Sequence, residues 1–247
     1  MWTHWRSYFE THARRPMPAP PADIDAIPAG WRGPLCASLA RFQLGEGGEG
    51  RIAREVQRGG LRGTDADYHA ALGLFVKEEG RHARILAGMV RALGGELLRR
   101  HWTERLFVVG RRLLGLRLKL VVLLAAEVLG LGFYALLSRR LGTGAIAEQL
   151  REIAEDEGMH LEFHADLFRA QVGDRTAARW VFRGVWWGVA LLACAVLVLD
   201  HRRTLRALGV PVLAASARLL RLVALVDRRV LGPAITTLAA WRTREAA

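Results

Sequence analysis

The sequence predicts an all-α fold: a four-helix bundle of two antiparallel helix pairs joined by a crossover, with an added C-terminal helical region. Hydrophobic residues make up 51% of the 247, which is ample for a single core, and they recur at helical rather than alternating spacing. Glycine and proline breaks divide this pattern into segments of helix length, and no segment carries a convincing hairpin signal. We divide the chain into an N-terminal arm (1–33), the bundle (34–172) and a C-terminal extension (173–247).

The first helix pair follows a polar arm whose Pro-rich stretch, 16–30, is typical of a linker or strap. The first helix is expected at about 35–58. The second starts from an N-cap at Thr64 or Asp65 and ends at about Leu93, before two glycines.

The second helix pair is expected after a longer connection, 96–114, that forms the crossover. Its helices are predicted at about 116–141 and 145–172, separated by a Gly-Thr-Gly turn. Two or three further helices follow, with breaks near 209–211 and 232–233.

The net charge of +12 first suggests a nucleic-acid partner. We exclude this class because no DNA- or RNA-binding fingerprint or aromatic–basic strip accompanies the charge, and because two of the 36 basic residues are lysines, an arginine bias that coding composition alone can produce. From residue 175 onward, 12 arginines face three acidic residues, which is +9 of the +12. A basic, apolar tail fits a membrane surface better.

The two cysteines, Cys36 and Cys194, indicate no disulfide framework, so a reducing cytoplasmic environment is expected. The first fifteen residues lack the apolar region of a signal peptide.

Two segments carry the motif Glu-x-x-His, as Glu79–His82 and Glu157–His160. Residues three apart on a helix share a face, so each pair can reach a common metal ion. A single such pair also occurs by chance as two solvated side chains. The two pairs gain weight because Glu46 lies 33 residues before Glu79 and Glu127 lies 30 residues before Glu157.

In each half of the bundle, a glutamate is followed about thirty residues later by Glu-x-x-His. This length corresponds to one helix and a turn, so the glutamate and the motif lie at the same level along two antiparallel helices. Two such hairpins bring four carboxylates and two imidazoles into one core, the ligand plan of di-iron and di-manganese carboxylate bundles. Glu127 is the strongest single observation, because it is the one charged residue among the 18 from Leu120 to Leu137. A buried carboxylate is normally paired or metal-bound; the alternative is a protonated core glutamate.

Several other polar residues compete for roles. Glu49 shares the face of Glu46 and is an alternative or additional ligand. Tyr134 and His164 lie on ligand faces and are candidates for contacts with the ligands or for ordinary core positions. The remaining polar residues are expected to be solvated or without a matching context: Glu78, Glu155, His4, His12, His69, His101 and His201.

These motifs resemble the ferritin-like superfamily, especially its rubrerythrin-type branch. Leu-Gly-Glu46-Gly is similar to that branch's first-helix segment, and Ala-Glu-Asp-Glu157-Gly-Met-His160 is similar to its fourth. The resemblance covers about 35–172. It implies the six ligands in order and a cofactor of two iron ions; mixed oxygen and nitrogen ligation also allows manganese and suits zinc less.

Three departures qualify the resemblance. The chain has no Cys-x-x-Cys module, and Gly130 stands where rubrerythrin-type peroxidases carry an additional glutamate. The C-terminal third has no counterpart in cage-forming ferritins. For Gly130, room for a substrate and close helix packing are both open interpretations.

The resemblance implies an oxidoreductase that activates O2 or peroxide to oxidise an unidentified substrate, with electrons from an external donor. The resemblance does not identify this substrate; the basic, apolar tail favours a lipophilic one. The alternative is a non-catalytic iron-handling protein. The basic tail from Leu205 onward is a candidate for lying on an anionic membrane surface, for covering the bundle or for forming a homodimer interface, and the sequence does not choose among these. The segment 181–199 includes 16 uncharged residues, a length between a core helix and a membrane span, so its contact with a membrane stays open.

Overall fold

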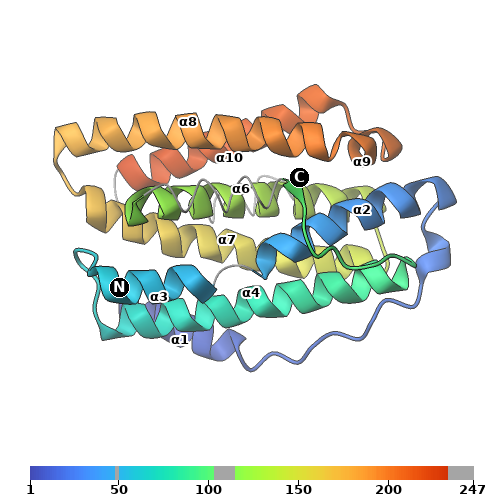
Figure 1. Cartoon of the computed structure of the whole chain (residues 1–247), viewed down its shortest axis with the longest axis horizontal. Helices are drawn as coiled ribbons and strands as arrows, with labels where there is room; N and C mark the ends of the chain where they lie inside the picture. Colours follow the sequence, from blue (N-terminus) through green and yellow to red (C-terminus); the bar gives the residue numbers. More distant parts are fainter. Residues whose placement is uncertain (48–49, 103–114, 233–247) are drawn as a thin grey trace.

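Helices dominate the computed structural model of the chain, which describes residues 1–47, 50–102 and 115–232 (Figure 1). Within those ranges there is no β-strand, which confirms the predicted all-α class.

The first predicted bundle helix is two helices, α2 (Ala29–Glu46) and α3 (Gly50–Gly59), with residues 48–49 outside the described part. The interruption has a physical cause, because four glycines lie between residues 45 and 50 and each weakens a helix by about 0.5–1 kcal/mol relative to alanine. α2 also begins earlier than predicted, directly after Pro28.

The other three bundle helices match the predicted ranges closely: α4 (Ala66–Ala92), α6 (Leu116–Leu141) and α7 (Ala145–Val172). Asp65 is the N-cap of α4, since its Oδ1 accepts a hydrogen bond of 2.9 Å from the Tyr68 backbone N–H. α2 packs on α4, α6 packs on α7, and α4 contacts α7 across the centre. Most of the predicted crossover, 103–114, lies outside the described residues.

The N-terminal arm was predicted to be polar, but its first part is an amphipathic helix. Residues Trp2–His12 form this helix, α1, which packs on the outside of α4. Trp2, Trp5 and Phe9 belong to the hydrophobic core and are 5%, 3% and 1% exposed. These three residues are spaced so that they share one helix face. The polar and charged residues between them make this apolar face hard to recognise in the sequence. The indole N–H of Trp5 donates to Asp166 of α7 at 2.9 Å, which ties the arm to the second helix pair.

The Pro-rich stretch after α1 is a strap, as one of the two interpretations predicted. It forms no α-helix before α2 begins at Ala29, contains a single 3-10 turn, Ile24–Ala26, and contacts both α4 and α7. The Gln149 amide of α7 donates to the Ala19 carbonyl at 2.8 Å, and the Arg81 guanidinium of α4 donates to the Pro16 carbonyl at 3.1 Å.

The C-terminal extension adds α8 (Thr176–Asp200), α9 (Arg202–Ala207) and α10 (Val212–Leu231) as a layer over the second helix pair (Figure 1). α8 contacts α6 and α10, and α10 contacts α6 and α7. The Arg229 guanidinium of α10 donates to Glu162 and Asp166 of α7 at 2.6 and 2.5 Å, which fixes the layer to the bundle.

Two of the described helices, α6 and α8, are long and apolar enough to cross a membrane. Length and composition alone are weak evidence, because core helices share both properties. The two helices differ in burial: 83% of the apolar window of α6 is buried inside the protein, against 33% for α8.

His201, which had no assigned context, is buried where α2 meets the corner between α8 and α9. Its Nδ1 and the Ser38 hydroxyl are hydrogen-bonded at 2.7 Å. Burial, together with the positive charge of Arg41, lowers the pKa of His201 to about 3. The unfolded chain therefore binds a proton between pH 6.5 and 3 that the folded chain rejects.

We expect the free energy of unfolding to fall as the pH is lowered through this window, by at most about 1.4 kcal/mol per pH unit from this group. Urea denaturation at a series of pH values measures the slope. His201→Asn is expected to flatten it, whereas replacing the exposed His4 by asparagine should leave it unchanged. Equal slopes in the parent and His201→Asn would contradict the assignment.

Candidate metal centre

The two Glu-x-x-His motifs meet in the core, where α4 and α7 face each other. One ligand atom from each of Glu79, His82, Glu157 and His160 lies within 4.8 Å of the others. All four residues are at most 2% exposed. This buried group can hold a metal ion, as the spacing of the motifs predicts.

The closest approaches cross between the two helices. Nδ1 of His160 lies 2.9 Å from a carboxylate oxygen of Glu79, and Nδ1 of His82 lies 3.3 Å from one of Glu157. Each histidine also lies near the glutamate of its own motif, at 3.4 Å for His160 and 3.7 Å for His82. The two motifs are therefore level, which follows from their matching places in the two hairpins.

Glu127 and Glu46 bring α6 and α2 to the same cluster. Glu127 is 4% exposed, and its Oε2 lies 3.4 Å from Nδ1 of His160. Burial of its carboxyl group, together with the charges of Glu79 and Glu157, raises the pKa of Glu46 well above its usual range. All six predicted ligands thus converge. Glu49, the alternative to Glu46, lies outside the described residues.

The inner atoms of this cluster are close together but unsatisfied. Five of them are buried and have no hydrogen-bond partner among the residues that the structure describes: Oε1 of Glu79, Oε2 of Glu127, Oε1 of Glu157 and Nδ1 of both His82 and His160. Buried polar atoms are normally satisfied, because an unmade hydrogen bond costs about 1–3 kcal/mol. Carboxylate and imidazole lone pairs directed at one space fit a cation.

The protonation of the cluster without a metal leads to the same conclusion. Burial and the Glu157 carboxylate raise the pKa of Glu127 well above its usual range. Burial opposes the charged form of His82, yet its hydrogen bond with Asp156 and the negative charges of Glu157 and Glu79 raise its pKa to about 9. Without a metal, protons on the carboxyl and imidazole groups therefore balance the negative charge of the cluster. Bound metal ions would balance this charge in place of the protons.

A second layer of carboxylates holds the outer nitrogen of each histidine. Nε2 of His82 hydrogen-bonds Asp156 at 3.1 Å, and Nε2 of His160 hydrogen-bonds Glu78 at 3.0 Å. Both acids are buried, so the expectation that Glu78 is solvated is wrong, whereas Glu155 is exposed as expected. Such partners fix the orientation of a metal-binding histidine and leave its other nitrogen free for the metal.

The second layer exchanges partners between the halves. Glu78 precedes Glu79 and binds the histidine of α7, while Asp156 precedes Glu157 and binds the histidine of α4. The sequence contains the signal for this arrangement, since both halves have an acidic residue directly before Glu-x-x-His.

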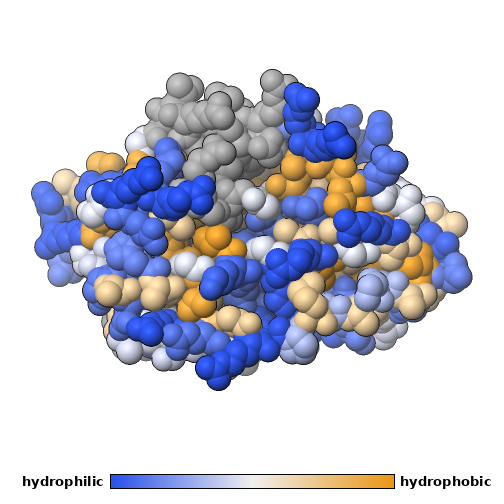
Figure 2. Space-filling model, turned by 60° about the horizontal axis from the view of Figure 1, so that its bottom comes forward, coloured by the Kyte–Doolittle hydropathy of each residue, from blue (hydrophilic) through white to orange (hydrophobic). Residues whose placement is uncertain are grey.

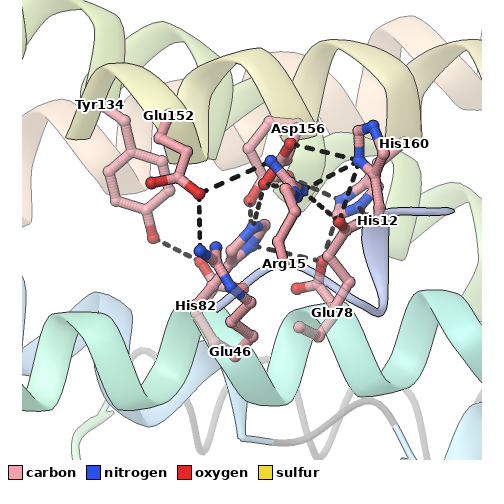
Figure 3. A network of polar contacts seen from close by, with 12 residues as sticks. His12, Arg15, Glu46, Glu78, His82, Tyr134, Glu152, Asp156 and His160 are labelled. Carbon is pink, nitrogen blue, oxygen red and sulfur yellow. Dashed lines mark hydrogen bonds and ion pairs between the residues drawn. The ribbon is translucent and has the colours of Figure 1, made fainter. Parts of the chain in front are cut away.

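Arg15, just after α1, joins the two acids of the second layer (Figure 3). One of its terminal nitrogens lies 2.5 Å from Glu78 and 2.8 Å from Asp156. His12 of α1, for which the sequence offered no matching context, lies 3.3 Å from Glu78 and 3.7 Å from Asp156 and so contacts this second layer. Burial opposes ionisation of Glu78, but its hydrogen bond with His160 and the surrounding positive charges lower its pKa to about 2.

The two candidate residues beside the ligands have different surroundings. The Tyr134 hydroxyl donates a hydrogen bond to Glu46, so of the two roles left open for Tyr134 the contact with a candidate ligand is the one observed (Figure 3). His164 is fully buried, with Nε2 4.0 Å from Glu127. Burial and the charge of His160 lower its pKa to about 3, so it is neutral.

Gly130 faces the cluster at close range. A Cβ atom there would lie 3.5 Å from Cδ of Glu157 and 3.3 Å from Cε2 of Tyr134. The distance to Glu157 of α7 is an ordinary van der Waals contact, and the tighter distance is to Tyr134 of the same helix, α6. The approach of α6 and α7 therefore does not require a glycine here, and both interpretations of Gly130 stay open.

No protein-family model, curated protein or solved structure matches this chain.

Proposed function

We propose that the chain is a di-iron carboxylate oxidoreductase with a ferritin-like bundle, which activates O2 or peroxide to oxidise a lipophilic organic substrate. The observation that carries this proposal is the buried cluster from α4, α6 and α7, in which each residue has a buried polar atom without a hydrogen-bond partner among the described residues: Glu79, His82, Glu127, Glu157 and His160. Glu46 of α2, which is partly buried, lies beside it and completes the two matching halves. Bundles that hold two metal ions place their ligands in this order.

Two ions are proposed because four carboxylates balance two divalent cations and leave the imidazoles neutral. Mixed oxygen and nitrogen donors suit iron or manganese, and carboxylates that bridge two ions are less typical of zinc. When bound, two ferrous ions supply the electrons with which O2 is reduced.

The residues of the chain bind, orient and shield this centre. Glu78 and Asp156 hold the histidines with Nδ1 inward, and Tyr134 holds Glu46. Aromatic rings keep water from His160: the Phe75 ring centre lies 4.8 Å from the His160 ring centre, and that of Phe9 from α1 lies 5.9 Å away. The proposal needs an external electron donor, since the sequence has no flavin or nicotinamide fingerprint.

Anaerobic reconstitution with ferrous iron, followed by rapid mixing with O2, tests the proposal. We expect the protein to bind about two irons per chain and to oxidise them once per mixing. A chemical reductant should then restore the ferrous state for further cycles, with oxidation of an added quinol or unsaturated lipid probe.

Continued ferric accumulation beyond two ions per chain, without oxidation of any probe, would contradict the enzymatic proposal and favour iron handling. The Glu127→Gln variant is the control for iron bound outside the cluster.

A further inference from the structure

The outer face of α8 is apolar from Trp180 to Leu199. Six large hydrophobic residues on it are 36–66% exposed: Trp180, Val181, Val185, Leu191, Leu192 and Leu199. The other exposed positions of the uncharged stretch 184–199 are Gly184, Gly188 and Ala195. This stretch is about 24 Å long at the rise of an α-helix. Continuous exposed apolar surface of this kind marks an interaction site.

The opposite face of α8 packs against the rest of the protein. Trp186 is fully buried, and its indole N–H donates to the Val223 carbonyl of α10 at 3.1 Å. Arg183 pairs with Asp227 of α10 at 3.1 Å. α8 lies along the outer edge of the molecule (Figure 1), so crossing a bilayer would break these contacts. The exposed face can meet a membrane with the helix lying in its plane.

Arginines stand at both ends of the apolar face. Arg202, Arg203 and Arg206 of α9 are exposed beyond its C-terminal end. At the other end, a pocket of about 570 Å³ is lined by Arg169, Arg179, Arg183 and the exposed Trp180. The guanidinium of Arg183 lies 5.5 Å from the Trp180 ring centre. Tryptophan and arginine at the rim of an apolar face are typical of the boundary between lipid headgroups and acyl chains.

The side of the molecule that lies below in Figure 1, brought forward in Figure 2, is different: mainly hydrophilic residues separate its apolar patches. We propose that α8 docks the protein on an anionic membrane, with its apolar face in the acyl boundary and the arginines at both ends on phosphate headgroups. The arginines at the ends of the apolar face favour an anionic membrane over a second copy of the chain, because the arginines of two such copies would face and repel each other. The inference does not depend on the metal centre.

Co-sedimentation of the full-length protein with vesicles tests the proposal. We expect binding to phosphatidylcholine vesicles that contain phosphatidylglycerol, and release by carbonate washing. Leu192→Glu places a charge on the apolar face, away from the packed face, and should weaken partitioning by at least about tenfold. Met17→Glu, at an exposed apolar residue of the strap, is the matched control and should bind like the parent.

The double variant Arg202→Gln, Arg203→Gln tests the role of charge. We expect it to bind the anionic vesicles more weakly by about fivefold per arginine while it keeps the parent's weak binding to pure phosphatidylcholine. Equal vesicle binding by the parent and Leu192→Glu would overturn the proposal, as would no binding by the parent or retention after carbonate washing. A parent that is dimeric by light scattering, becomes monomeric in Leu192→Glu and ignores vesicles would assign the face to a second copy.

Discussion

Replacing Glu127 by leucine is expected to abolish metal binding while leaving the metal-free fold intact or more stable. The carboxyl group is buried in an apolar stretch of α6, and one of its oxygens has no hydrogen-bond partner. Leucine fills a similar volume and leaves no polar atom to satisfy, so the free energy of unfolding of the metal-free protein should rise by about 0–2 kcal/mol.

The metal content should change in the opposite direction. The parent is expected to bind about two irons per chain and Glu127→Leu fewer than one, because a carboxylate from one of the four ligand helices is missing. Elemental analysis after anaerobic reconstitution and desalting measures the content, and urea denaturation of the chelated proteins measures stability. These opposite signs separate loss of the site from loss of the fold.

Glu155→Leu is the matched control, since Glu155 lies on α7 two residues before a ligand yet is exposed. This variant should keep the metal content of the parent. If Glu127→Leu bound as much iron as Glu155→Leu, the site would not include Glu127. If a well-folded parent took up no iron at all, the metal centre itself would be refuted.

The sequence predicted the ligand residues of this site because helical spacing shows which residues share a helix face, and because the same spacing occurs in both halves of the bundle. Glu127 stood out as a charge in an apolar segment, and the Glu-x-x-His pairs stood at equal distances from their partner glutamates. Glycine breaks likewise located the ends of α6 and α7. These signals depend only on local helix geometry, so they hold in the folded protein whenever the segment forms a helix.

The outer layer escaped prediction for a geometric reason. Glu78 lies about 100° around the helix from Glu79, which suggests solvent for a helix with a single buried stripe. In this bundle α4 is covered on a second side by α1, so Glu78 is buried as well. The contact of Arg15 with Asp156 spans 141 residues and depends on how α1 docks on α4, which the local sequence pattern does not predict.

Removing the guanidinium of Arg15 is the second change for which we expect a large effect. Arg15→Met keeps an unbranched apolar side chain but leaves Glu78 and Asp156, both buried, without the cation that lies 2.5 and 2.8 Å from them. Breaking a buried ion pair costs about 3–5 kcal/mol. Because the Arg15 side chain is 28% exposed, we expect the lower end of that range for the metal-free protein.

The same change should weaken metal binding without touching a ligand. Asp156 and Glu78 set the orientation of His82 and His160 through Nε2, and Arg15 sets the positions of both acids. Loss of partners in such an outer layer typically lowers metal affinity by about 10–100-fold. Competition with a chromogenic chelator measures the affinity, and chemical denaturation of the chelated protein measures the stability.

Two further variants separate the bridging role of Arg15 from its charge. Arg14→Met removes an exposed arginine next to it and should change neither quantity. Arg15→Lys keeps the charge but replaces the rigid, planar guanidinium, one nitrogen of which contacts both acids, by an ammonium group on a flexible chain, so we expect it to recover stability more than affinity. Metal affinity in Arg15→Met equal to that in Arg14→Met would show that the histidines keep their orientation without the arginine, and that the arm merely covers the centre.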